Sequence, residues 1–266
     1  MPRAYLALAV AGFRRYATYR QATIAAAVTN SVFGFLRCAI LFAVVDAGAR
    51  VVAGYDASRL ATFVWAGQGI IGVVLIWAPT DFADRIRTGD VVSDLLRPVD
   101  LIWQQLAGDL GRAAHAVFTR FLAPVAVGAL FFHLHLPERP ATYVLFASSV
   151  VMATIVCFGC RFLVNAAAYW LLDARGPQMA WTMLSGFLGG LYFPLWFFPD
   201  AMATALIVAT PFPSIIQLPL DVLVERGPLA EQLALLSVQA SWVVMILALC
   251  RWVQRRGEIK LVVQGG

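Results

Sequence analysis

The sequence predicts an all-α integral membrane protein built as a single domain over residues 1–266. Of its 266 residues, 61% are hydrophobic and only 13% are charged, whereas soluble globular chains have about 45–50% apolar and about 25% charged residues. One core of this size cannot bury the excess, so lipid is the expected solvent. The charged residues lie in short tracts between long apolar runs, as loops between transmembrane helices do. Because of these positions, the net charge of +5 does not indicate binding to nucleic acid.

Six apolar runs are long enough for transmembrane helices, which need about 20 mostly apolar residues. They are Thr23–Ala47, Leu60–Ala78, Ala113–Phe132, Ala141–Leu172, Met179–Phe198 and Gln232–Arg251. A seventh apolar stretch, Ala201–Leu220, contains Pro211, Pro213 and Pro219, each of which would interrupt a membrane helix. We therefore predict that residues 197–231 form an external re-entrant region of two short helices before the sixth span. Six spans place both termini on the same side.

The basic residues indicate which side that is. Thirteen of them lie on the side of the termini: Arg3, Arg14, Arg15, Arg20, Arg85, Arg87, Arg97, Arg112, Arg175, Arg251, Arg255, Arg256 and Lys260. The opposite loops carry four, namely Arg50, Arg59, Arg139 and Arg226. Loops rich in Lys and Arg stay in the cytoplasm, so we expect a multi-pass protein of the inner (plasma) membrane with both termini cytoplasmic. A seventh span would send the basic C-terminal segment outside, against this rule.

Residues 1–21 are predicted to form a helix along the inner membrane interface. Leu6, Val10 and Phe13 recur at helical spacing, and Arg14 and Arg15 follow where they can reach lipid headgroups. An apolar stripe beside basic residues is typical of interfacial amphipathic helices. We expect the first span to turn upward from the end of this helix.

A charged, helix-prone element, residues 80–100, separates the second span from the third. In "DFADRIRTGDVVSDLLRPVD", we expect Asp81 to cap a first short helix, Thr88–Gly89 to interrupt it, and Asp90 to cap a second helix running to Pro98. One face of the second helix would gather Val91, Val92, Leu95, Leu96 and Val99. Two interpretations stay open: a solvated turn resting on headgroups, or a docking helix that carries motion from a cytoplasmic partner into the membrane.

No chemistry of its own is predicted for this chain, so it has no expected catalytic residue, metal site or cofactor. It contains no G-x-x-x-x-G-K-[ST] phosphate loop, so ATP hydrolysis would have to come from another polypeptide. It also lacks G-x-S-x-G and H-E-x-x-H, which disfavours a membrane enzyme. His133 and His135 lack a third ligand, and Cys157 and Cys160 lie within an apolar run, as packing residues do.

Three segments of the sequence together resemble a known family. The segment "GDVVSDLLRPVD" is similar to the G-x-[IV]-x-x-x-L-[LI]-[KR]-P element that follows the second span of bacterial ABC-2-type permeases. Ser185–Gly227 resembles their small-residue turn, their aromatic and proline-rich break and their closing P-x-x-x-x-x-x-G, and "AAAYWLLDARG" resembles an aromatic pair in their fourth span. The resemblance covers nearly the whole chain.

The resemblance implies a type V exporter architecture. Such a permease has six spans, an N-terminal interfacial helix, a coupling helix between spans two and three, and a re-entrant helix pair before span six. It would pair with a second permease, identical or homologous, and with two ABC ATPase subunits that hold ATP and Mg. The wider group exports drugs, antibiotics, lipids and polysaccharides, so we expect alternating-access export of an amphipathic or hydrophobic compound whose identity stays open.

Two sets of residues are predicted to carry this function. The contacts with the ATPase would come from Asp84, Arg87, Gly89, Asp90, Asp94, Leu95, Leu96, Arg97 and Pro98. The translocation path or outer gate would include Arg37, Phe193, Pro194, Trp196, Phe197 and Phe198. A charge near the middle of a span is costly, so Arg37 should face protein or water, either in the path or in a structural pair. The aromatic residues also fit an interfacial belt.

The alternative function is a secondary transporter or channel driven by an ion gradient. Such proteins place acids or histidines near the bilayer midplane. Asp46 is the only acid within a predicted span, and it lies at the outer end. The sequence therefore favours an ATP-driven permease over an ion-driven one.

Overall fold

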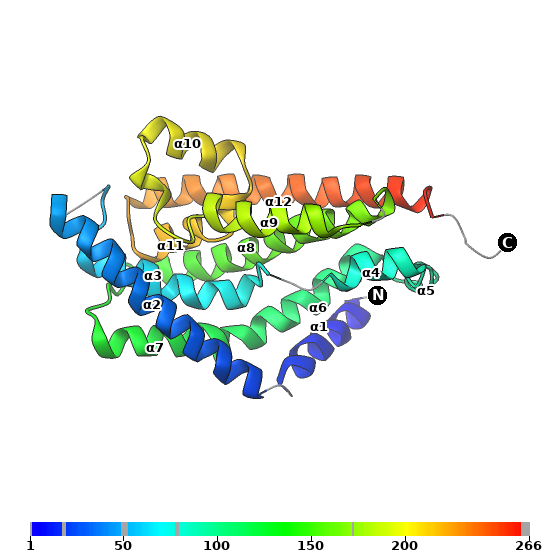
Figure 1. The fold of residues 1–266 in the computed structure, drawn as a ribbon, viewed down its shortest axis with the longest axis horizontal. Helices are drawn as coiled ribbons and strands as arrows, with labels where there is room; N and C mark the ends of the chain where they lie inside the picture. Colours follow the sequence, from blue (N-terminus) through cyan, green and yellow to red (C-terminus); the bar gives the residue numbers. More distant parts are fainter. Residues whose placement is uncertain (1, 18–19, 49–52, 78–79, 172, 262–266) are drawn as a thin grey trace.

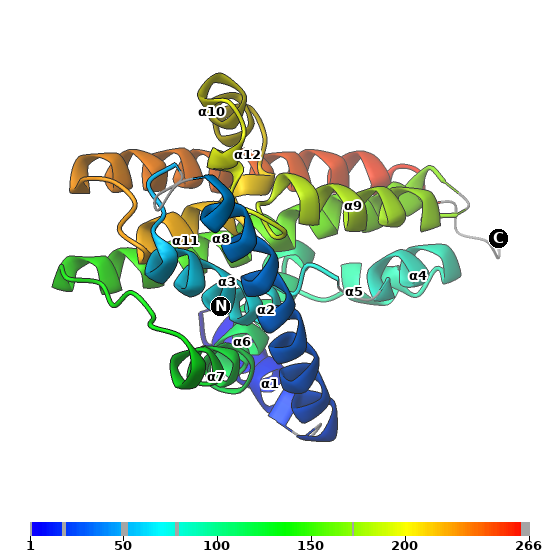
Figure 2. The same ribbon diagram turned by 60° about the vertical axis from the view of Figure 1, so that its left-hand side comes forward.

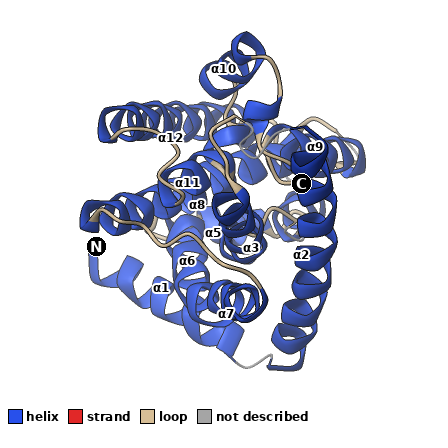
Figure 3. Ribbon diagram, turned by 90° about the vertical axis from the view of Figure 1, so that its left-hand side faces the viewer, coloured by secondary structure: helices blue, strands red, loops and turns tan. Residues whose placement is uncertain are grey.

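The computed structural model describes residues 2–17, 20–48, 53–77, 80–171 and 173–261, which contain helices and no strand (Figure 3). The longer elements are α1 (Pro2–Ala17), α2 (Arg20–Gly48), α3 (Ala57–Val74), α4 (Asp81–Thr88), α5 (Val91–Leu95), α6 (Leu101–Ala116), α7 (Leu122–Phe131), α8 (Pro140–Ala166), α9 (Arg175–Leu188), α10 (Asp200–Ala209), α11 (Gln217–Leu223) and α12 (Leu229–Glu258). The short ones are the π segment η1 (Val117–Phe121) and the 3₁₀ turns η2 (Ala167–Tyr169), η3 (Leu195–Phe197) and η4 (Phe212–Ser214). The predicted all-α class is confirmed. Arg50 and the side chain of Asp46 lie outside the described residues.

α3 forms the centre of the molecule, and α2, α6, η1, α7, α8 and α11 pack around it (Figure 3). Of the residues in α3, 83% are buried, as expected for an almost wholly apolar helix. Trp65 fills the space between α3 and two neighbours, where Gly34 of α2 and Gly128 of α7 face its ring. A Cβ at Gly128 would come within 2.4 Å of the indole, so glycine is required for this close packing.

Among the helices near the long axis, α3, α8 and α12 run in one direction and α6, α7 and α9 in the opposite one (Figure 1). α3, α6 with α7, α8, α9 and α12 run near the long axis, whereas α2 crosses them obliquely (Figure 1). α4, α5 and the end of α12 lie at one end of the molecule, and α1 begins near it. This end is the one predicted to be cytoplasmic, and it is called the coupling end below.

Within the described residues, five helices are long and apolar enough to cross a membrane: Ile24–Val44, Ala57–Val74, Leu101–Phe131, Pro140–Tyr169 and Leu229–Glu258. The predicted fifth helix, Met179–Phe198, is wrong in its second half. α9 has 14 residues and ends at Leu188, which gives a length of about 21 Å. The chain turns at Gly190, whose φ of +79° favours glycine. The total of six spans therefore stays a prediction.

The third long helix begins earlier than predicted. α6 starts at Leu101 because the Asp100 carboxylate accepts hydrogen bonds from the backbone N–H groups of Ile102 and Trp103, at 3.1 and 3.2 Å. These bonds satisfy donors that a helix start leaves free. The helix therefore continues from the charged element directly into the apolar bundle.

α1 is a helix, as predicted, and it crosses α6 at very short range. A Cβ at Gly111 of α6 would lie 1.8 Å from the carbonyl oxygen of Ala9, so only glycine allows this crossing. The outer face of α1 leaves Leu6, Val10 and Phe13 exposed, at 66%, 42% and 37%. That face suits an interfacial helix, although the position of the membrane stays a prediction.

The proline-containing stretch forms two short helices, as predicted. α10 projects from the side of the bundle (Figure 2), while α11 is fully buried through most of its length. Pro219 does not break the second helix, contrary to expectation. It lies in the first turn of α11, where a missing N–H removes no intrahelical hydrogen bond.

Candidate functional site

The charged element of residues 80–100 folds as two short helices at the coupling end. α4 ends at Gly89, whose φ of +82° is the left-handed conformation that glycine adopts at no steric cost. The predicted interruption is confirmed, but the predicted caps are wrong. The cap position of α4 is Thr80 rather than Asp81, and Asp90 makes no capping bond to α5, which ends at Leu95 rather than Pro98.

The predicted apolar face of the second helix is also wrong. Val91 is buried, but Val92 and Leu96 are exposed, and Asp94 is buried instead. The Asp94 carboxylate lies 2.6 Å from a guanidinium nitrogen of Arg85 and 3.8 Å from one of Arg97. The inward-facing Asp94 carboxylate therefore links α5 to α4. The spacing of apolar residues in the sequence did not predict this inward position.

Three long helices hold this element in place. The Asn165 side chain of α8 accepts a hydrogen bond from the backbone N–H of Ala83 at 3.2 Å, and Phe82 stacks on Phe162 of α8 at 4.9 Å between ring centroids. Asp100 caps α6 and also accepts a hydrogen bond from Arg251 of α12 at 3.0 Å. The element is therefore fastened to α6, α8 and α12 together.

The opposite side of the element is open. Leu96 is 81% exposed at its tip, and Asp84, Arg87, Gly89, Asp90, Arg97 and Pro98 are exposed as well. Two hollows that contain charged residues flank it: one of about 500 Å³ between the α5–α6 connection and the end of α12, and one of about 250 Å³ beside α4 and the start of α9. Of the predicted ATPase contacts, Asp94 is buried and Leu95 is partly buried, so these two support the element rather than face outward.

At the other end of the bundle, the predicted gate residues lie in the break between α9 and α10. Gln217 of α11 holds this break, because its side-chain oxygen accepts the backbone N–H of Leu195 at 2.9 Å. Phe193 packs edge-on against Phe187 and Phe198, while Trp196 and Phe197 are half-buried. Together with Pro194, these residues form one aromatic block beside α11.

A buried carboxylate that the sequence reading missed organises this block. Asp221 of α11 is 1% exposed and accepts hydrogen bonds from the Tyr55 hydroxyl, from Trp196 Nε1 at 2.8 Å and from Gln217 Nε2 at 2.8 Å. The guanidinium of Arg226 lies 3.7 Å above the Trp196 ring. The sequence did contain a signal for this buried acid, because Asp221 is the single charged residue in the apolar run "QLPLDVLV".

Arg37 is buried in protein, as predicted. It lies on α2 and is 9% exposed, beside Gly67 of α3, where a Cβ would be 3.9 Å from a guanidinium nitrogen. No hydrogen-bond acceptor among the described residues meets any of its three nitrogens. Such an unpaired buried cation is costly and calls for a functional explanation.

A sequence model of the ABC-2 family transporter protein matches residues 33–263, which include the coupling-end element, the aromatic block and Arg37. The chain belongs to the ABC-2 family. It is accordingly an integral membrane protein and the permease subunit of an ABC transporter, which is not itself the ATPase, and association with ABC ATPase components follows from the family. No curated protein and no solved structure matches the chain.

One further carboxylate clamps two loops of this ABC-2 permease, at the end of the molecule opposite the coupling end (Figure 1). Glu225, in the loop between α11 and α12, accepts hydrogen bonds from the backbone N–H groups of Glu138 and Arg139, from Arg139 Nε and from the Thr142 hydroxyl, at 2.5–3.1 Å. His135 lies 3.8 Å away, and no metal-binding cluster is present among the described residues. Burial by itself raises the pKa of Glu225, but these donors outweigh it and lower the pKa from 4.5 to about 2.

The Glu225 clamp predicts acid sensitivity. Since the pKa is lower in the folded permease, the clamp stabilises the fold fully above pH ~4.5 and loses this effect as the pH falls toward ~2, by at most about 3 kcal/mol. Thermal unfolding of the detergent-purified permease from pH 7 to 2.5 should therefore show a steeper loss for the natural protein than for Glu225→Gln. Glu138→Gln, an exposed acid in the same loop region, is the matched control and should keep the natural pH profile.

Proposed function

We propose that this permease exports an amphipathic or hydrophobic compound by alternating access, driven by two ATPase subunits that hold ATP and Mg. A second permease, identical or homologous, completes the membrane part. In this scheme, closure of the ATPases pushes the α4–α5 element. The push rocks the bundle and opens a path between the two permeases past the aromatic block.

The observation that carries this proposal is the fastening of the α4–α5 element to α6, α8 and α12 with its tip left open. A solvated turn needs no such anchors, whereas a helix that transmits motion from an ATPase to the transmembrane helices does. Any displacement of Phe82, Ala83 or Asp100 acts on long helices directly. Because α12 follows the external loop clamped by Glu225, motion at the coupling end has a covalent route to the aromatic block.

The aromatic block and Arg37 have complementary roles in this scheme. The Asp221 network holds Trp196 and Leu195 against α11, which keeps the outer side closed at rest. Arg37 lies on α2 without an acceptor among the described residues. We assign it to the path, where it would meet a polar or anionic group of the transported compound once the helices separate.

The proposal is tested by co-expression of the permease with its ATPase and reconstitution of the complex in vesicles loaded with a fluorescent amphiphile. We expect co-purification of the two proteins and efflux that requires ATP and Mg. An ATPase carrying a Lys→Ala change in its own phosphate loop is the control and should support no efflux. Efflux by the permease alone, without nucleotide, would contradict the proposal.

The ion-driven alternative is tested in the same vesicles. A proton or sodium gradient imposed in the absence of ATP should drive no transport. Asp221 is the buried acid most relevant to that alternative, but its carboxylate is occupied by three donors, as in a structural latch. Gradient-driven flux that disappears in Asp221→Asn would favour the alternative.

A further inference from the structure

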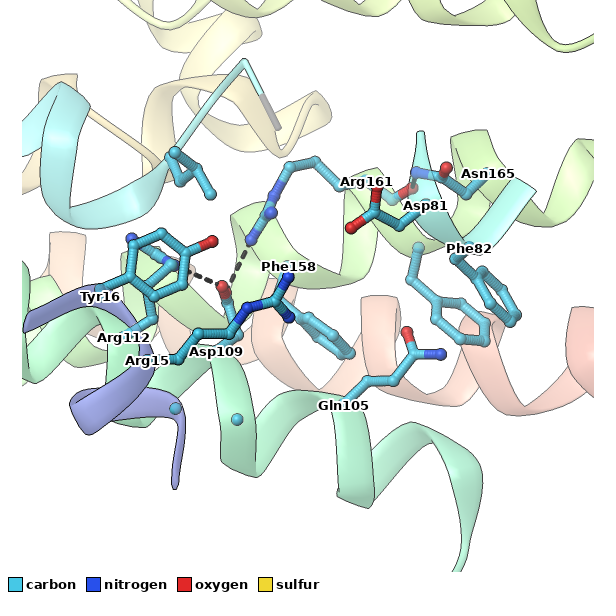
Figure 4. A pocket seen from close by; sticks show the side chains of 14 residues that line it. Arg15, Tyr16, Asp81, Phe82, Gln105, Asp109, Arg112, Phe158, Arg161 and Asn165 are labelled. Atoms are coloured by element: carbon cyan, nitrogen blue, oxygen red, sulfur yellow. Dashed lines mark hydrogen bonds and ion pairs between the residues drawn. The ribbon is translucent and has the colours of Figure 1, made fainter. Parts of the chain in front are cut away.

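A cavity of about 280 Å³ lies at the coupling end between α1, α6, α8 and the beginning of α4 (Figure 4). One part of its lining is charged: Arg15, Asp81, Asp109, Arg112 and Arg161. The other part is apolar: Leu75, Phe82, Phe158 and Phe162. A cavity with both kinds of lining fits a small polar headgroup better than a free ion in water.

The charged part is built around one carboxylate. Asp109 of α6 accepts hydrogen bonds from Arg112 Nε at 2.7 Å and from a guanidinium nitrogen of Arg161 at 2.6 Å. Arg112 is fully engaged, because its other nitrogens donate to the carbonyl oxygens of Gly72 and Val73, at 3.2 and 2.8 Å. Asp109 thus neutralises only one of the two arginines that it holds.

Two arginines keep unused capacity at this cavity. Arg161 is 89% buried, with an exposed side-chain fraction of 11%, and its Nε has no acceptor among the described residues. Arg15 is an exposed residue of α1 and forms no ion pair within the described part of the chain. Figure 4 shows the side chains of Arg15, Arg112 and Arg161 gathered around Asp109. With Asp81 included, three cations face two anions, so the cavity has room and charge for one more anion.

The position of α1 indicates that such an anion would come from the membrane surface. α1 lines one side of the cavity and leaves Leu6 and Val10 exposed, together with part of Phe13, whose ring also packs edge-on against His115 of α6. Exposed apolar side chains at helical spacing are typical of a helix embedded in a membrane surface. Both Gly12 and Gly108 line the cavity: Gly12 lets α1 lie close against α6, and Gly108 leaves open space where a side chain would otherwise stand. A molecule that occupies it can keep its acyl chains in the bilayer beside α1.

We propose that this cavity binds the phosphate headgroup of an anionic amphipathic molecule of the inner leaflet. Arg15 and Arg161 donate to the phosphate oxygens, and Phe158 and Phe162 cover the first apolar atoms of the tail. Guanidinium groups suit phosphate because they present several fixed donors to it. The site is independent of the proposed transport function, and its test uses no ATP.

The experiment measures binding to the full-length permease in neutral detergent by native mass spectrometry and titration calorimetry. The probes are short-chain phosphatidylglycerol, short-chain phosphatidylcholine and glycerol phosphate. We expect phosphatidylglycerol to bind at least about tenfold more tightly than phosphatidylcholine, because the net positive lining favours a net anionic headgroup. Glycerol phosphate, which has no tail, should bind weakly.

Two variants test the site itself. Arg15→Glu should weaken phosphatidylglycerol binding about tenfold or more, whereas Arg14→Glu should change it less than about twofold. Arg14 is the matched control, since it is an exposed neighbour on α1 that does not line the cavity. Gly108→Leu should fill part of the cavity and block binding while every charged residue stays in place. The fold should tolerate this side chain, because a Cβ at Gly108 meets no other atom within 4 Å. Unchanged gel-filtration profiles verify that each variant folds.

Each outcome decides the proposal. Equal losses in Arg14→Glu and Arg15→Glu would show general attraction to surface charge and would overturn it, as would full binding by Gly108→Leu. No phosphatidylglycerol binding by the natural protein would overturn it too. Tight binding of glycerol phosphate that Arg15→Glu abolishes would support the phosphate chemistry but overturn the membrane lipid as its source.

Discussion

Leu96→Asp is expected to abolish transport by the assembled ABC-2 transporter while leaving the permease folded. Leu96 is 81% exposed at the tip of the α4–α5 element, so its replacement disturbs no internal packing. Under the proposed function it is buried against an ATPase, and burial of a leucine contributes about 1.5–3 kcal/mol. An aspartate in that place forfeits this contribution and adds the cost of desolvating a carboxylate.

The measurements are ATPase affinity and transport per ATP hydrolysed. We expect the ATPase to bind at least about tenfold more weakly to the variant, and hydrolysis at saturating ATPase to drive no efflux. Ile259→Asp is the matched control, because Ile259 is 79% exposed at the same end of the molecule, beyond the end of α12. Normal transport by Leu96→Asp, or equal loss in both variants, would contradict the role of the element.

Leu96 is a better probe than its neighbour. Leu95 is partly buried and packs against the core, so Leu95→Asp would confuse unfolding with loss of coupling. The sequence predicted both leucines as ATPase contacts, whereas in the structure only Leu96 is exposed and free to make such a contact.

Asp221→Leu is expected to destabilise the permease by roughly 3–5 kcal/mol, because it leaves buried donors without an acceptor. Tyr55, Trp196 and Gln217 would lose the oxygen atoms that bring the segment before α3, the aromatic block and α11 together. The apparent midpoint of thermal unfolding in detergent should fall by about 10 °C or more.

The control for this variant is Asp200→Leu, which removes an exposed acid at the start of α10, close in sequence to the aromatic block. It should shift the midpoint by no more than about 2 °C. Tyr55→Phe, which removes one donor, should have an intermediate effect. A midpoint of Asp221→Leu equal to that of the natural protein would show that the network does not hold the aromatic block and α11 together.

The sequence by itself determined the all-α membrane class, the approximate ends of α2, α3 and α8, and the place of the charged element between the second and third long helices. It could do so because apolar run length and the position of charges depend on the bilayer as solvent, not on which helices touch. The helix break at Gly89 and the two short helices around Pro211 follow from local backbone chemistry in the same way.

Only the tertiary structure decided which polar residues work together. Asp94 turns inward to meet Arg85, Asp109 lies between Arg112 and Arg161, and Asp221 gathers donors from distant segments. α9 ends at Leu188 because the following residues are drawn onto Gln217, 22 residues beyond Leu195. Such pairings are set by which helices pack side by side, and a buried carboxylate takes whatever donors that packing brings. The hydropathy of the sequence does not show which helices pack side by side, so it could not predict these pairs.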